Sequence, residues 1–100
     1  MARTNYRRGV EKERACMEAL ENAGYIPMRT AGSHGIFDCI AIGPTGIRLI
    51  QVKRVKKGNS WQGEYKDSKE QIDSLPRFPS VSYEFWVWED STGWIVREVL

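Results

Sequence analysis

Residues 36–54 read IFDCIAIGPTGIRLIQVKR, and this stretch decides the fold. Its two apolar runs flank residues 43–46, Gly-Pro-Thr-Gly, which are strong turn formers, so the pattern predicts a β-hairpin. The first run, residues 36–42, is apolar on both faces apart from Asp38, which is typical of a buried central strand. The returning strand is expected to cover residues 47–54.

The hairpin collects polar side chains at one end of a sheet face. A four-residue turn sets Ile42 opposite Ile47, and the same register sets Asp38 opposite Gln51. Residues directly opposite each other on antiparallel strands have Cβ atoms about 4.5–5.5 Å apart. Lys53 projects from the same face as Gln51, because side chains alternate along a strand. The pattern therefore predicts a cluster of Asp38, Gln51 and Lys53.

The rest of the chain adds further elements to this hairpin. Apolar periodicity predicts helices at 8–23 and 67–75, an exposed loop at 55–65, and strands at 25–30, 81–88 and 93–100. Pro27 favours an edge position for the first strand. The order α-β-β-β-α-β-β predicts a single α/β domain over residues 1–100, with a central mixed sheet flanked by helices.

Composition excludes several classes of protein. With 41% hydrophobic and 28% charged residues, the chain is neither disordered nor a coiled coil. No apolar run approaches the roughly 18 residues of a membrane span, and the charged N-terminal residues do not resemble a signal peptide. Cys16 and Cys39 lie in apolar patterns without zinc-like spacing. We therefore expect a soluble, cytoplasmic protein with buried, reduced cysteines.

Charge is divided unevenly along the chain, although the net charge is only +2. Residues 1–63 carry eleven Lys and Arg against five acids, whereas residues 64–100 carry four against eight. Between Asp38 and Glu64 there are five bases and no acid. A basic half of this kind favours a polyanionic partner, most often nucleic acid.

Glu13 adds a second carboxylate to the predicted cluster. It lies on the same stripe of the first predicted helix as Val10, Met17 and Leu20, and a carboxylate facing a core destabilises the fold unless a partner binds it. If this helix packs on the sheet face that bears Asp38, two carboxylates, an amide and an ammonium group converge. Such oxygen ligands suit a hard divalent cation, which polarises a phosphate and lowers the pKa of an attacking water.

Three segments of the chain follow one another in a recognisable order. They are residues 9–14 (Gly-x3-Glu-Arg), 31–41 (Ala-Gly-Ser-x4-Asp-x-Ile-Ala) and 49–54 (Leu-Ile-Gln-Val-Lys-Arg). Together they resemble the PD-(D/E)xK nuclease superfamily, and within it the archaeal-type Holliday junction resolvases, over roughly residues 7–75. The resemblance implies a restriction-endonuclease-like core, and a homodimer that uses Mg²⁺ or Mn²⁺ to make paired nicks in four-way DNA junctions.

The resemblance also implies roles for individual residues. Glu13, Asp38 and Gln51 become metal ligands, Lys53 the catalytic lysine, and Ser33 a serine close to the scissile phosphate. Two positions depart from the family pattern, since Phe37 stands where the family has proline, and Gln51 replaces an acidic ligand. Because glutamine supplies one neutral oxygen, we expect weaker metal binding than with a carboxylate.

A further set of residues is predicted to contact DNA, because basic segments flank the proposed site and an indole ring can stack on an unpaired base. The set is Arg7, Arg8, Arg14, His34, Arg54, Lys56, Lys57 and Trp61. For the basic residues and His34 the alternative is a solvated surface, and for Trp61 it is a loop anchor. Glu13 and Asp38 alternatively form structural ion pairs, and Gln51 an ordinary strand hydrogen bond.

Three functions are compatible with these residues. The first is a metal-dependent endonuclease that resolves Holliday junctions or related branched DNA. The second is a VRR-NUC-like repair nuclease that acts on flaps or ends, and the third is a DNA-binding module whose site is degraded at Gln51. The strand at 81–88 is apolar on both faces, so it is either central or at a subunit interface, and we expect a homodimer interface there.

Overall fold

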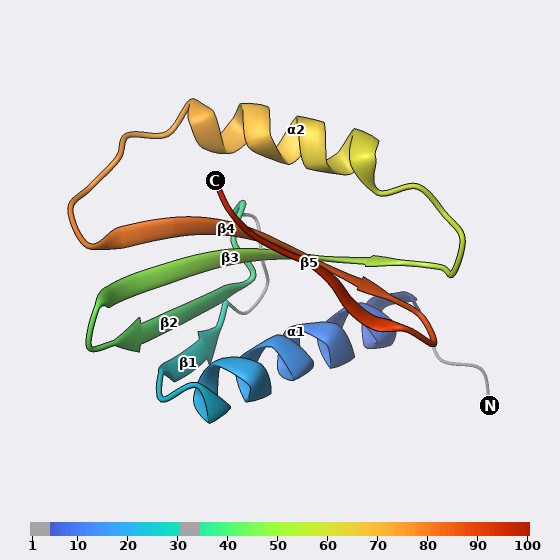
Figure 1. Ribbon diagram of the computed structural model, residues 1–100, viewed down its shortest axis with the longest axis horizontal. Coiled ribbons are helices and arrows are strands. Elements are labelled where there is room, and N and C mark those ends of the chain that lie inside the picture. The colour runs from blue at the N-terminus through green and yellow to red at the C-terminus, as the bar shows by residue number, and fades with distance from the viewer. Residues whose placement is uncertain (1–4, 31–34) are drawn as a thin grey trace.

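The computed structural model describes residues 5–30 and 35–100, with side chains from residue 11 onward in these ranges. A five-stranded sheet has α1 on one side and α2 on the other (Figure 1). The elements are α1 (Asn5–Asn22), β1 (Ile26–Arg29), β2 (Cys39–Gly43), β3 (Gly46–Val55), α2 (Gln62–Asp73), β4 (Val81–Glu89) and β5 (Gly93–Val99). The strand order is β1-β2-β3-β4-β5, and the parallel pairing of β3 with β4 makes the sheet mixed, as predicted. No helix in the described part of the chain is long and apolar enough to cross a membrane.

The β2–β3 hairpin has the register predicted from its turn. Ile42 pairs with Ile47, and the pairing continues to Cys39 opposite Ile50. Gly46 closes the turn with φ of 130°, and a Cβ at this position would lie 2.1 Å from the carbonyl oxygen of Ser80, so only glycine fits. β2 begins at Cys39 rather than at residue 36, which leaves Asp38 just outside the strand.

α1 covers one face of the sheet. Its side chains Cys16 and Leu20 pack in a buried cluster with Ala41, Ile50 and Trp86. This face of β3 is the one opposite to Gln51 and Lys53, because side chains alternate along the strand. α1 therefore does not pack on the face that bears Gln51 and Lys53, so the condition under which all four groups converge on one face is not met.

α2 covers the other face and begins earlier than predicted. Tyr65, Ser68 and Ile72 recur at helical spacing, and Ser68 and Ile72 are buried. The ring of Tyr65 packs edge-on against Phe85, with ring centres 5.5 Å apart. The predicted helix at 67–75 therefore starts five residues earlier, at Gln62, and the predicted loop at 55–65 is shorter. The low helix propensity of Gly63 hid this start.

β4 is a central strand with both faces buried. It pairs with β3 on one side and with β5 on the other. Trp86 is 1% exposed on the α1 side, and Phe85 and Val87 are fully buried on the α2 side. The prediction of a homodimer interface on this strand is therefore wrong, because its two apolar faces belong to the core of one chain.

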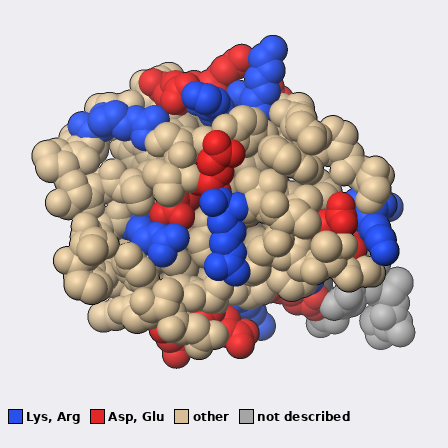
Figure 2. Space-filling view, viewed as in Figure 1, with Lys and Arg blue, Asp and Glu red and all other residues tan. Residues whose placement is uncertain are grey.

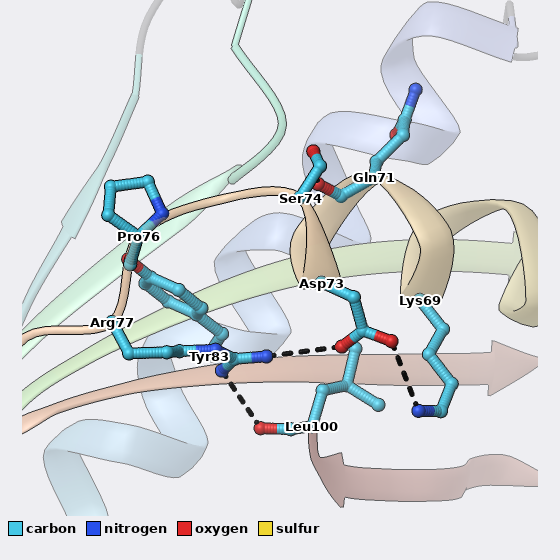
Figure 3. A network of polar contacts seen from close by, with 8 residues as sticks. All are labelled: Lys69, Gln71, Asp73, Ser74, Pro76, Arg77, Tyr83 and Leu100. Atoms are coloured by element: carbon cyan, nitrogen blue, oxygen red, sulfur yellow. Dashed lines mark hydrogen bonds and ion pairs between the residues drawn. The ribbon is translucent and has the colours of Figure 1, made fainter.

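Arg77 links the C-terminal end of α2 to Leu100 through polar contacts (Figure 3). Asp73 binds Lys69 at 3.3 Å and Arg77 at 3.2 Å. Arg77 also donates a hydrogen bond to the carbonyl oxygen of Leu100 at 3.1 Å, and its guanidinium carbon lies 4.7 Å from the centre of the Tyr83 ring. Arg77 thus joins α2, β4 and the chain terminus.

Arg77→Ala is expected to lower the free energy of unfolding by about 1 kcal/mol, because it removes an exposed ion pair and one hydrogen bond. Urea denaturation followed by circular dichroism measures the change. Lys69→Ala is the matched control, since it removes only the ion pair with the same Asp73 and should have a smaller effect. An equal or larger loss in the control would contradict this role of Arg77.

Candidate active site

Asp38 lies where β3 runs on beyond the end of β2. Its N–H donates to the carbonyl oxygen of Ile50 at 2.9 Å, and its Oδ2 accepts a hydrogen bond from the N–H of Val52 at 2.8 Å. These two contacts fall on either side of Gln51, so they hold the carboxylate beside that residue. Thr30, which follows β1, donates its N–H to the Asp38 carbonyl oxygen at 3.0 Å. Backbone contacts from two neighbouring strands therefore fix the position of Asp38.

Glu13 reaches the same region from α1. One of its carboxylate oxygens lies 3.6 Å from Nε of Arg29, and its side chain is only 18% exposed. Burial raises the pKa of the Glu13 carboxyl, and the charge of Asp38 raises this pKa further, whereas Arg29 lowers it. Burial also raises the pKa of Asp38, against the opposing effects of the Val52 N–H and the charge of Lys53. Two carboxylates that repel each other thus lie near an ammonium group.

Gln51 contributes an oxygen without a partner. Its Oε1 is buried and accepts no hydrogen bond from the described residues. An unpaired buried carbonyl oxygen costs about 1–3 kcal/mol, so such an atom requires an explanation. Carboxylate oxygens such as those of Glu13 and Asp38, and an amide oxygen such as this one, are the donor types that a hard divalent cation takes.

These candidate ligands carry two formal negative charges, one on Glu13 and one on Asp38. Within residues 5–30 and 35–100, no three His, Cys, Asp or Glu side chains gather as a metal site. The candidate here has two carboxylates, and its third oxygen comes from an amide. It also draws on both sides of the sheet, because Glu13 comes from α1 while Gln51 and Lys53 point from the opposite face of β3. Asp38, which directly precedes β2, interacts electrostatically with both Glu13 and Lys53.

The residues predicted to contact DNA fall into different surroundings. The exposed ones are Arg14, Lys56 and Lys57. Arg54 is bound to Asp90 through two hydrogen bonds, one of them 3.1 Å long. Trp61 is half-buried and packs edge-on against Tyr65, which favours the loop-anchor interpretation. Outside the described residues lie Ser33 and His34, and also the side chains of Arg7 and Arg8.

Arg29 is a site residue that the sequence analysis did not single out. It is the charged residue of an edge strand that is otherwise apolar, and it faces Glu13 across the space between β1 and α1. Its Nε is buried and has no hydrogen-bond partner in the described part of the chain. The only sequence signal was the isolated charge in the run 26–29, which does not reveal its partner.

Glu84 is a second charged residue that the sequence analysis missed. It is 2% exposed and accepts two hydrogen bonds from Arg48, at 2.6 and 2.7 Å. The indole N–H of Trp86 and the hydroxyl of Ser82 also donate to it, each at 3.1 Å. Although burial opposes ionisation, these donors together lower the pKa of Glu84. With its oxygens satisfied in this way, Glu84 has a structural role at the end of the sheet away from Asp38.

Comparison with models of protein families shows to which family this chain belongs. A family model described as archaeal Holliday junction resolvase (Hjc) matches residues 4–83. This chain belongs to that family. The match runs from α1 into β4 and includes Glu13, Asp38, Gln51 and Lys53. The resemblance predicted from the sequence is confirmed, and with it the assignment as a Holliday junction resolving nuclease.

A solved structure is similar to this resolvase-family chain. Hjc from Archaeoglobus fulgidus, a Holliday junction resolvase from an archaeal hyperthermophile, superimposes with a TM-score of 0.57 at 17% sequence identity. The similarity covers 87% of this chain and 69% of the other. At this identity the likeness shows the fold, so the predicted α/β class with a mixed sheet and flanking helices is confirmed. Comparison with the curated proteins gives no match.

Proposed function

We propose that this protein is a metal-dependent endodeoxyribonuclease that resolves Holliday junctions or related branched DNA by paired nicks. In this proposal Glu13, Asp38 and Gln51 bind Mg²⁺, for which Mn²⁺ can substitute. The observation that carries the proposal is the buried, unpartnered Oε1 of Gln51 next to the fixed carboxylate of Asp38. A strand glutamine with a purely structural role would have its oxygen hydrogen-bonded.

The residues around this donor set have separate tasks. When bound, the cation polarises the scissile phosphate and lowers the pKa of a water molecule. Val52 fixes one oxygen of Asp38 by its N–H, and Arg29 favours the ionised form of Glu13 by lowering its pKa. Lys53, whose charge acts on Asp38, supplies positive charge for the phosphoryl oxygens as negative charge develops there.

Cleavage of labelled DNA tests this function. A four-way junction and a matched linear duplex are incubated with the protein in Mg²⁺, Mn²⁺ or EDTA. We expect paired, metal-dependent nicks in the junction alone. Metal-dependent cutting of the linear duplex without preference for the junction would favour the repair-nuclease alternative. Binding without cutting in either metal would favour a DNA-binding module.

The cytoplasmic location stays a prediction.

Gln51→Glu is expected to lower the Mg²⁺ concentration that gives half-maximal cleavage, because it adds a negative charge to the donor set. The effect should be about tenfold, which corresponds to about 1.4 kcal/mol of metal binding. A Mg²⁺ titration of junction cleavage measures it, with Gln71→Glu on the exposed surface of α2 as the control for added charge. A higher Mg²⁺ requirement in Gln51→Glu would contradict the ligand role.

We also propose that a second copy of the chain supplies the second nick, through a surface other than β4. Ile26, Ile42 and Ile47 lie side by side across three strands, on the side of the sheet facing α2, and are 68%, 43% and 38% exposed. Met28, 45% exposed, extends this apolar row along β1. Two symmetric nicks require two equivalent sites, which a twofold dimer provides.

Sedimentation velocity tests this dimer surface. Ile42→Lys is expected to shift the protein from dimer to monomer, because the lysine charge cannot be buried in an apolar contact. Ile95→Lys on β5, where the wild-type residue is 37% exposed, is the matched control and should leave the dimer intact. A monomeric wild-type protein, or an Ile42→Lys variant that stays dimeric, would contradict this surface.

A further inference from the structure

Three tryptophans lie next to one another on the α1 side of β4 and β5, namely Trp86, which is 1% exposed, and the half-buried Trp88 and Trp94. α1 packs mainly against β1, β2 and β3. On the same face of β4 and β5, the ring of Trp94 stands edge-on to those of Trp86 and Trp88, with ring centres 5.2 and 5.1 Å apart. We call these three residues, together with Lys12 and Arg97, the tryptophan face.

Two cations are held on these rings. Nζ of Lys12 lies 4.3 Å from the centre of the Trp88 ring. The guanidinium carbon of Arg97 lies 4.6 Å from the centre of Trp86 and 5.7 Å from that of Trp94. These distances are within the range of about 6 Å at which a cation is attracted to an aromatic face. The rings therefore position both cations.

These two cations differ from most of the described arginines, which form ion pairs with carboxylates. The arginines in ion pairs are Arg29, Arg48, Arg54 and Arg77. Lys12 and Arg97, in contrast, form no ion pair within the described residues and rest on uncharged rings. An ion pair cancels the charge of a base toward a third group, whereas an aromatic ring leaves it available. Both cations are thus prepared to bind an anion.

The tryptophan face lies next to the part of the candidate site that α1 contributes. Lys12 directly precedes Glu13 on α1, and Trp88 lies beside Arg54 in the pairing of β4 with β3, whereas Gln51 and Lys53 point from the other face of β3. On the face drawn in Figure 2, Lys and Arg side chains form separate groups, with Asp and Glu among them, in a mostly uncharged surface. A polyanion that binds across such a surface depends on individually positioned cations.

We propose that the tryptophan face binds the phosphate backbone of the DNA arm next to the cut. Lys12 and Arg97 each contact a phosphate, and Trp86, Trp88 and Trp94 hold the two cations in place. Phosphate contacts set the orientation of a protein on DNA without reading its sequence, which suits a substrate defined by branching. This inference rests on the proposed function and adds the path of one arm across the protein.

Binding of a fluorescent four-way junction in EDTA, over a series of salt concentrations, tests the inference. The double variant Lys12→Gln, Arg97→Gln is expected to bind about tenfold more weakly or worse near physiological salt. The slope of log K against log salt should fall by about two, because each lost phosphate contact contributes about 0.9. The matched control is Lys66→Gln, Lys69→Gln, which removes the same charge from α2 and should leave the slope unchanged.

A charge-retaining pair separates loss of charge from loss of fold. Lys12→Arg, Arg97→Lys should bind with the wild-type slope. A wild-type slope in the Lys12→Gln, Arg97→Gln variant would overturn the inference. If the oligomeric state of this variant also changed while the slope did not, the tryptophan face would be assigned to a contact between protein chains instead. Failure of the wild-type protein to cut junctions in Mg²⁺ would instead refute the proposed function, and this is seen without any variant.

Discussion

Asp38→Asn is expected to abolish cleavage of four-way junctions, with a loss of about a thousandfold or more, and at the same time to raise the melting temperature of the metal-free protein. Activity falls because the donor set loses one of its two carboxylates. Junction binding should be retained or become tighter, because a charge that repels phosphate is removed. Single-turnover cleavage, anisotropy and thermal unfolding measure the three effects.

The gain in stability follows from the direction of the pKa shift. Burial raises the pKa of Asp38, so the fold disfavours the ionised form of this carboxyl group. A carboxyl group whose pKa is raised by folding stabilises the fold fully when the pH is below its pKa in the unfolded chain, which is about 4. This stabilisation is lost as the pH rises through the pKa of the group in the folded protein. The asparagine side chain does not titrate, and its oxygen can still accept the hydrogen bond from the N–H of Val52. The difference from wild type should therefore be present at pH 7 and shrink toward pH 4.

Asp67→Asn is the control, because Asp67 is exposed on α2, far along the chain from the site. It should change neither the cleavage rate nor the melting temperature appreciably. A stable, folded Asp38→Asn protein that cleaves at the wild-type rate would end the site assignment. A strongly destabilised Asp38→Asn protein would instead show that the carboxylate has a structural role.

Glu84→Gln is expected to destabilise the protein by about 2–3 kcal/mol. Removing one partner of a buried ion pair leaves the other charge uncompensated, at a cost of about 3–5 kcal/mol when both are buried. Arg48 is 25% exposed, so solvent reduces this cost. The ring contacts of Arg48 with Tyr25 and Trp86 are expected to persist, because they do not depend on the Glu84 charge. Urea denaturation at pH 7 measures the change.

The pH dependence gives an independent check. The donors around Glu84 hold its pKa below the usual value, so its stabilising effect is present above about pH 4.5 and is lost as the pH falls through the lowered pKa. The gap between wild type and Glu84→Gln should therefore be constant near neutrality and close in acid. Glu98→Gln, an exposed carboxylate on β5, is the control. A gap that widens in acid would contradict the ion-pair account.

The local part of the fold was predictable from the sequence. The turn at 43–46 and the alternation around it fixed the register of β2 and β3, and the structure confirms it from Ile42 opposite Ile47 to Cys39 opposite Ile50. The same register predicts that Asp38 lies next to Gln51. Such short-range pairing is set by turn geometry and side-chain alternation, both of which are local properties.

The long-range part was not predictable in the same way. The parallel pairing that sets Arg48 next to the β4 residues Ser82 and Glu84 joins segments more than thirty residues apart, so no local pattern reveals that Glu84 binds Arg48. For the same reason β4 was interpreted as a subunit interface when it is a central strand. The face on which α1 packs also depends on tertiary packing rather than on its own periodicity.

Direct measurement of metal binding tests the central claim most directly. Mn²⁺ is titrated into the wild-type protein and into Asp38→Asn, and the bound ion is followed by electron paramagnetic resonance. We predict one Mn²⁺ per wild-type chain, and an affinity at least about tenfold lower in Asp38→Asn, which corresponds to about 1.4 kcal/mol or more. Equal affinity in the two proteins, or no binding to the wild type, would contradict a cation site formed by Glu13, Asp38 and Gln51.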